Sequence, residues 1–253
     1  MKRLGATFVA AALVVACAPA GGTADGAARA RQCGGAAAPS PSAPGWLRQR
    51  RMTVLVDSVL LGGTRALRRR FWCWRVRKVG EPALMVRAAE RELRASRRRV
   101  DRLVVVGLGY NSLWERRRRH YRRWARRFDR EANRLLTTLR ARGARQIVWV
   151  TLRRSNRRNV PPNARGGLGQ YSWYFPYVNE RLRRLDRRHG DVVLARWDRA
   201  GNRPGVTYDS IHLNPRGARL MARTIERAIG RAARAGATSR PGASPPRARA
   251  PRR

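Results

Sequence analysis

Short apolar runs alternate with longer amphipathic segments along the middle of the chain. The apolar runs predict buried strands near residues 53–57, 103–107, 146–151 and 191–195, and a less distinct strand near residues 71–79. Apolar residues recur at helical spacing near residues 82–97, 115–142, 173–188 and 215–230. This alternation indicates an α/β fold of three layers, in which helices cover a parallel sheet.

Glycine and proline positions support these boundaries. Pro82 suits the first turn of the helix near residues 82–97. Gly143 is placed to end the long helix just before the strand near residues 146–151. Residues 153–172 contain two prolines and three glycines and indicate a long loop, which in a compact domain is often a binding loop or a lid.

The pattern changes at both ends of the chain. Residues 1–20 combine two basic residues, an apolar stretch and small residues, as a secretory leader does, so we expect export. Residues 21–45 are rich in Gly, Ala, Pro and Ser, which indicates a flexible linker. Residues 46–230 then form one folded domain, and the basic residues 231–253 form a disordered tail.

The leader leaves the mode of export open. Cys17 follows a bacterial lipobox pattern and is a candidate for lipidation, which would make the protein a lipoprotein at the cell envelope. Residues 18–20 instead offer an ordinary signal-peptidase site, which would release a secreted protein. An uncleaved anchor is the third alternative, although the apolar run is shorter than the roughly 20 residues that span a bilayer.

Cysteine and histidine are sparse. Cys33 and Cys73 are the cysteines outside the leader, and an oxidising compartment makes them a candidate disulfide. Three histidines, His120, His189 and His212, are scattered along the chain and belong to no Cys/His cluster. We therefore expect no metal site and no cofactor.

The net charge of +43 comes almost entirely from arginine. Arginines occur in every predicted helix instead of gathering in one recognition element, so we do not expect dedicated nucleic-acid binding. Such a surface attracts polyanions in a salt-dependent way. For an exported protein, wall polymers, acidic glycans and anionic lipid headgroups are the relevant polyanions.

Polar residues with catalytic potential follow several predicted strands. Ser58 comes directly after the first strand, Asn111 follows the second apolar run, and Asp209 and His212 lie just before the last helix. Since the carboxyl ends of parallel strands share one edge of a sheet, these side chains could meet there. A serine, an imidazole base and a carboxylate that orients the base are the catalytic groups of a serine esterase. Separately, Ser58 could be a helix cap, Asn111 a turn or cap residue, and Asp209 a turn residue before Pro215.

Four segments together resemble the sequence blocks of the SGNH, or GDSL-like, hydrolases. They are residues 57–59 (Asp-Ser-Val), Gly80, residues 109–111 (Gly-Tyr-Asn) and residues 209–212 (Asp-Ser-Ile-His). The resemblance covers about residues 50–230. It implies a flavodoxin-like three-layer fold, a triad of Ser58, His212 and Asp209, and an oxyanion hole from Ser58, Gly80 and Asn111. Val56 stands where the family usually has glycine before the Asp-Ser pair.

The function expected from this resemblance is that of an exported serine esterase. Its substrate would be a small acyl ester or an acylated glycan, such as the O-acyl groups of a cell-wall or surface polysaccharide, and Ser58 would carry the acyl group. An acyltransferase and a non-catalytic module that binds an anionic polymer or glycan are the alternatives. The sequence shows neither the acyl group nor the oligomeric state.

Overall fold

The computed structural model describes residues 43–113, 116–166, 168 and 172–238. These residues belong to one compact unit, Ala38–Arg253. The predicted leader, nearly all of the linker, Cys17, Cys33 and the last part of the tail lie outside the described residues. No helix in the described part of the chain is long and apolar enough to cross a membrane.

Five parallel strands form one sheet in the order β2-β1-β3-β4-β5. The strands are β1 (Arg51–Val56), β2 (Arg75–Val79), β3 (Leu103–Gly107), β4 (Gln146–Val150) and β5 (Val192–Ala195). This order is the flavodoxin-like arrangement, as expected. The central strands β1, β3 and β4 are buried almost throughout, because helices cover both faces of the sheet and every side chain of an inner strand faces a helix layer.

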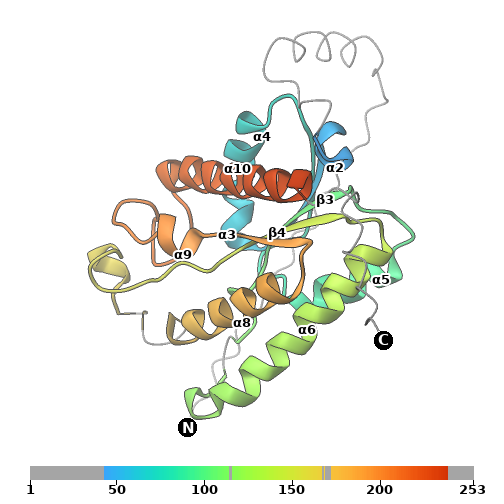
Figure 1. Cartoon of the computed structure of the whole chain (residues 1–253). Coiled ribbons are helices and arrows are strands. Elements are labelled where there is room, and N and C mark those ends of the chain that lie inside the picture. Colours follow the sequence, from blue (N-terminus) through green and yellow to red (C-terminus); the bar gives the residue numbers. More distant parts are fainter. Residues whose placement is uncertain (1–42, 114–115, 167, 169–171, 239–253) are drawn as a thin grey trace, which may run out of the picture. The chain divides into compact units, whose positions relative to one another are not determined.

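Helices form the two outer layers (Figure 1). They are α2 (Gly45–Arg48), α3 (Ser58–Leu61), α4 (Thr64–Arg70), α5 (Val86–Ala95), α6 (Tyr121–Ala141), α8 (Phe175–Arg188), α9 (Trp197–Ala200) and α10 (Pro215–Thr238). Short 3₁₀ turns lie at Arg118–His120, Pro162–Ala164 and Ser172–Tyr174. On one face α10 packs beside α4 and over β4 and β5, whereas α6 packs between α5 and α8 on the other face. The predicted three-layer α/β fold is confirmed.

The helix predicted near residues 82–97 begins later than its pattern indicates. Pro82 lies in a turn, Ala83 has a φ of 62°, and Met85 is extended, so α5 starts only at Val86. The proline therefore belongs to the β2–α5 loop. Gly143, in contrast, ends the long helix as predicted, with a φ of 109° that favours glycine. The strand expected near residues 71–79 is shorter, because residues 71–74 form a turn.

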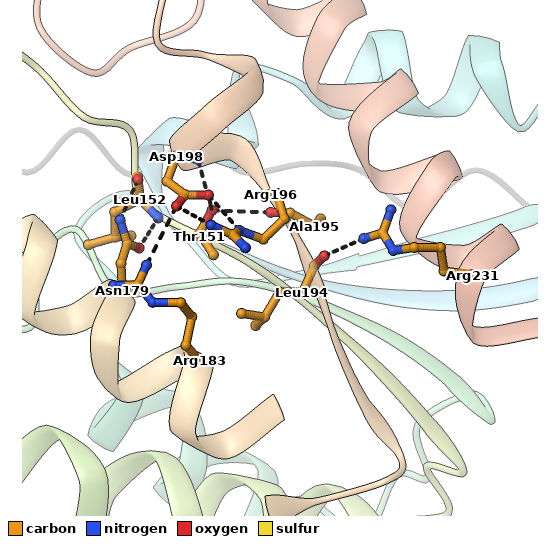
Figure 2. A network of polar contacts seen from close by, with 9 residues as sticks. All are labelled: Thr151, Leu152, Asn179, Arg183, Leu194, Ala195, Arg196, Asp198 and Arg231. Atoms are coloured by element: carbon orange, nitrogen blue, oxygen red, sulfur yellow. Dashed lines mark hydrogen bonds and ion pairs between the residues drawn. The ribbon is translucent and has the colours of Figure 1, made fainter. Parts of the chain in front are cut away.

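The last helix continues past the predicted start of the disordered tail. Helix α10 reaches Thr238, and Ala232 is 2% exposed. Arg231 donates a hydrogen bond of 2.7 Å to the carbonyl oxygen of Leu194 at the end of β5, as Figure 2 shows. The prediction of a disordered tail is therefore wrong for residues 231–238, because the helix continues through them, with Ala232 in the core and Arg231 bonded to the end of β5.

Polar contacts tie the carboxyl end of β4 to its neighbours (Figure 2). Asn179 of α8 accepts from the backbone N–H of Leu152 and donates to the carbonyl of the same residue. Asp198, which is fully buried, accepts hydrogen bonds from Thr151 and Arg196. These contacts satisfy backbone groups just where the strands stop pairing, and so they fix the loops that leave this edge of the sheet.

Candidate active site

Three of the predicted residues come together at the carboxyl edge of the sheet. Ser58 Oγ lies 3.1 Å from His212 Nε2, and His212 Nδ1 lies 2.6 Å from Asp209 Oδ2. The side chains of Asp209 and His212 are each 44% exposed, so solvent reaches the pair. With its Nδ1–H directed at the carboxylate, the imidazole leaves Nε2 free to accept the proton of the serine hydroxyl.

The end of β1 places Ser58. Val56 is the last residue of the strand, Asp57 is the N-cap of α3, and Ser58 is the first helical residue. Asp57 Oδ1 accepts from the backbone N–H of Val59 at 3.0 Å and of Leu60 at 3.4 Å. The cap is therefore Asp57, and the alternative of Ser58 as a capping residue is wrong. The Ser58 hydroxyl therefore does not cap the helix and contacts His212 instead.

A tight turn before α10 holds Asp209 and His212. Asp209 Oδ1 accepts from the backbone N–H of Ile211 and of His212, each at 2.7 Å, while Oδ2 faces the ring. Burial opposes ionisation of Asp209, but hydrogen bonds from the His212 ring and the two N–H groups outweigh it and hold the pKa of Asp209 below its usual value. The carboxylate therefore stays charged and can orient the imidazole.

Arg153 holds this turn in place through hydrogen bonds to Thr207 and Ser210, and the sequence analysis did not identify this arginine. Its side chain is fully buried, and its five N–H groups reach five acceptors. The acceptors are the carbonyl oxygens of Gly201, Asn159, Arg203 and Ser210 and the hydroxyl of Thr207. Burial lowers the pKa of Arg153. No feature of the sequence distinguishes this arginine from the many others in the chain.

Gly80 lies beside the strand that leads to Ser58. It has a φ of 118°, and a Cβ at this position would lie 2.3 Å from the carbonyl oxygen of Val56. Only glycine therefore allows the chain to pass this close to β1. Val56 itself pairs with Gly107 of β3, so the strand continues up to Asp57 although the family's usual glycine is absent.

Asn111 lies in the loop that follows β3, the strand next to β1. Its Nδ2 is covered and has no hydrogen-bond partner within the described residues. A buried amide donor without an acceptor is costly. The roles of Asn111 and Gly80 as oxyanion donors remain predictions, because no contact of either with Ser58 is observed.

The comparisons with known proteins agree with this fold. No family model and no curated protein matches the chain. Among solved structures, a GDSL-like lipase from Bacteroides thetaiotaomicron has a TM-score of 0.54 at 14% identity, covering 82% of this chain and 98% of its own. A putative acylhydrolase from Bacteroides fragilis has a TM-score of 0.55 at 14% identity over 80% and 94%. An acetyl xylan esterase has a TM-score of 0.53 at 13% identity over 70% and 99%.

The chain has the GDSL-like, or SGNH, hydrolase fold. At these identities the likeness concerns the fold, so the roles of individual residues are argued from the contacts of this chain. Within the SGNH fold, Ser58 follows β1 and the Asp-x-x-His turn precedes the last helix. In the described part of the chain, no group of three His, Cys, Asp or Glu side chains is placed to hold a metal ion.

The aromatic side chains near the loop after β3 and the start of α8 are mostly part of the hydrophobic core. Tyr110, Tyr174 and Phe175 are buried, and the hydroxyl of Tyr110 accepts from the backbone N–H of Arg153 at 2.7 Å. Trp173 is partly exposed, and Trp114 and Tyr171 lie outside the described residues.

Cys73 is disulfide-bonded. Its candidate partner Cys33 lies outside the described residues, so the pairing stays a prediction.

Asp57 is a buried carboxyl beside the nucleophile. Its Oδ2 has no hydrogen-bond partner in the described part of the chain. Burial raises the pKa of Asp57 to about 7, although the N–H groups of Leu60 and Val59 and the nearby His212 oppose the shift. Folding therefore favours the protonated form of this group.

The raised pKa predicts how stability depends on pH. The stability that the protonated form contributes is fully present below 3.8, the pKa of an ordinary aspartate as in the unfolded chain. This contribution is lost as the pH rises through about 7, the pKa in the folded protein. We expect the free energy of unfolding of the wild type to fall relative to that of Asp57→Asn, by at most about 1.4 kcal/mol per pH unit, between about pH 4 and pH 7. Urea unfolding of both proteins at several pH values measures the difference, and parallel curves would contradict the shift.

Proposed function

We propose that the protein is an esterase of the SGNH type that forms an acyl-enzyme on Ser58. The observation that carries this proposal is the pair of contacts from Ser58 Oγ to His212 Nε2 and from His212 Nδ1 to Asp209 Oδ2. A serine hydroxyl becomes a nucleophile when an adjacent base takes its proton, and an imidazole held by a carboxylate is such a base. Esterase chemistry also agrees with the fold.

In the first half-reaction, Ser58 Oγ attacks the ester carbonyl carbon while its proton passes to His212 Nε2. Asp209 stabilises the imidazolium that forms. The oxyanion accepts hydrogen bonds from the backbone N–H of Ser58, a first-turn group that has no acceptor within its helix, and from Gly80 N–H and Asn111 Nδ2. The C–O bond to the alcohol then breaks, and the alcohol leaves with the proton from His212.

In the second half-reaction, water takes the place of the alcohol. His212 removes a proton from the water as its oxygen attacks the acyl carbon, and the C–O bond to Ser58 breaks as Oγ regains a proton from His212. The acid leaves and the enzyme returns to its starting state. A sugar hydroxyl in place of water would make the same protein an acyltransferase.

For the substrate, we propose O-acyl groups on a cell-wall or surface polysaccharide. One solved structure with this fold is an acetyl xylan esterase. The proposed export of the chain, as a secreted protein or as a lipoprotein anchored through Cys17, would bring the site to such a polymer. The triad is half-exposed, which suits an ester carried on a large chain.

The test compares wild type with Ser58→Ala on a short-chain aryl acetate, using the full chain. We expect the Ser58→Ala rate to fall to the buffer background, and a serine-directed phosphonate to add to the wild type only. Ser96→Ala, at the end of α5, is the matched control and should keep the wild-type rate. Serine-dependent labelling without ester hydrolysis would indicate a transferase. No labelling and no hydrolysis would overturn the proposal and leave a binding module.

A further inference from the structure

An arginine-lined groove runs between α5 and α6. Its main cavity has a volume of about 300 Å³. Five arginines line it: Arg87 from α5, and Arg123, Arg127, Arg130 and Arg134 from α6. The four arginines of α6 recur at helical spacing, so they form one stripe that faces α5.

The groove carries far more positive than negative charge. Glu131 is its one acidic lining residue, and this carboxylate already pairs with Arg127 at 2.8 Å. Arg87, Arg130 and Arg134 make no ion pair with any acid of the described chain. Like charges gathered in one concave surface repel each other, and an anion placed between them removes that repulsion.

Polar atoms without partners point to a ligand in the same place. A smaller cavity continues the groove and shares Arg87, Trp124, Arg127 and Glu131 with it. Trp124 Nε1 and Ser112 Oγ, both from residues that line this smaller cavity, are buried and have no hydrogen-bond partner among described residues. An acceptor that entered the cavity could satisfy both donors.

The smaller cavity adjoins the loops that hold the proposed oxyanion donors. It is lined by Met85, which follows Gly80 in the β2–α5 loop, and by Ser112, which directly follows Asn111. Strand β1, which leads to Ser58, lies between β2 and β3, the strands that precede these loops. The groove therefore begins at the edge of the sheet that carries the triad and leads away along α6.

We propose that this groove binds carboxylate or phosphate groups of an anionic sugar chain that carries the scissile ester. The inference rests on the proposed esterase function and names its substrate class. Arginine forks pair well with carboxylates and phosphates. Single-stranded nucleic acid fits less well because it needs open aromatic faces for stacking. Trp124 is only partly exposed, with guanidinium groups of Arg116 and Arg123 at 4.7 Å and 5.5 Å from its ring centre.

The kinetic test uses two acetylated oligosaccharides, one of galacturonate units and one of neutral xylose units. Replacing both Arg87 and Arg130 with Gln should lower the ratio of kcat/KM for the anionic over the neutral substrate by about tenfold or more. The matched control replaces Arg219 and Arg223 of α10, two exposed arginines on the other face of the sheet, and should leave the ratio unchanged. Equal ratios in both double variants would overturn the inference.

A binding test separates this inference from the proposed function. Ser58→Ala, with and without the Arg87→Gln and Arg130→Gln changes, is titrated at about 0.15 M salt, where exposed charges are screened. The probes are oligogalacturonate, a glucose-phosphate oligomer and single-stranded DNA of equal charge. Groove-dependent binding of either of the first two supports the inference and identifies the anion. Tightest binding of DNA, or binding that ignores the groove changes, overturns it. Failure of the aryl acetate test concerns the proposed function instead.

Discussion

His212→Ala is expected to lower kcat for hydrolysis of a small ester by about 10⁴-fold or more. The structure gives the reason, because Nε2 of this residue lies 3.1 Å from Ser58 Oγ, which is the distance at which it can take the hydroxyl proton. No other side chain in the described residues forms a hydrogen bond to Ser58 Oγ. Without the imidazole, the hydroxyl remains a poor nucleophile and the leaving alcohol has no acid.

The double variant Ser58→Ala/His212→Ala makes this prediction sharper. Residues that act in one proton relay lose their effect together, so the double variant should be no slower than either single variant. The measurement is kcat for an aryl acetate in all four proteins, with urea unfolding as a check that each is folded. Multiplicative losses would show that the two residues act independently, which contradicts the relay.

Much of the sheet could be predicted because its strands depend on short stretches of sequence. The runs that became β1, β3, β4 and β5 are apolar and bounded by turn residues, and buried parallel strands need little else. Ser58 directly follows β1, and the Asp209–His212 turn lies just before α10. From the sequence these side chains could meet, but the turn follows α9 and not a strand, so the contact between them does not follow from the order of the parallel strands alone.

The support beneath the site could not be predicted, because it depends on contacts between distant residues. Arg153 is separated by 48 positions from Gly201 and by 57 from Ser210, and nothing near it in the sequence marks it as buried. The start of α5 was predicted too early for a different, local reason. The positive φ of Ala83 sets a turn there that helical periodicity does not reveal.

Arg153→Met is expected to destabilise the protein by about 4 kcal/mol and to lower ester turnover as well. The substitution keeps a long apolar stem but leaves four carbonyl oxygens and one hydroxyl without their donors inside the protein. Two of those acceptors, Thr207 and Ser210, flank Asp209, and the Thr207 hydroxyl in turn donates to the Asp209 carbonyl. Loss of Arg153 therefore loosens the turn that orients His212.

Arg154 offers the matched control for this prediction, because it is the next residue and its side chain is exposed. Arg154→Met removes the same charge and should change the free energy of unfolding by less than about 0.5 kcal/mol. Arg153→Lys keeps the charge but offers only three donors to the five acceptors. The stability of this variant should therefore lie between those of wild type and Arg153→Met. Urea unfolding orders the four proteins, and kcat measured well below each unfolding midpoint reports the turn. Equal stability of Arg153→Met and Arg154→Met would show that the loop is held by its other contacts, such as the hydrogen bond from Ser155 Oγ to the Ser210 carbonyl.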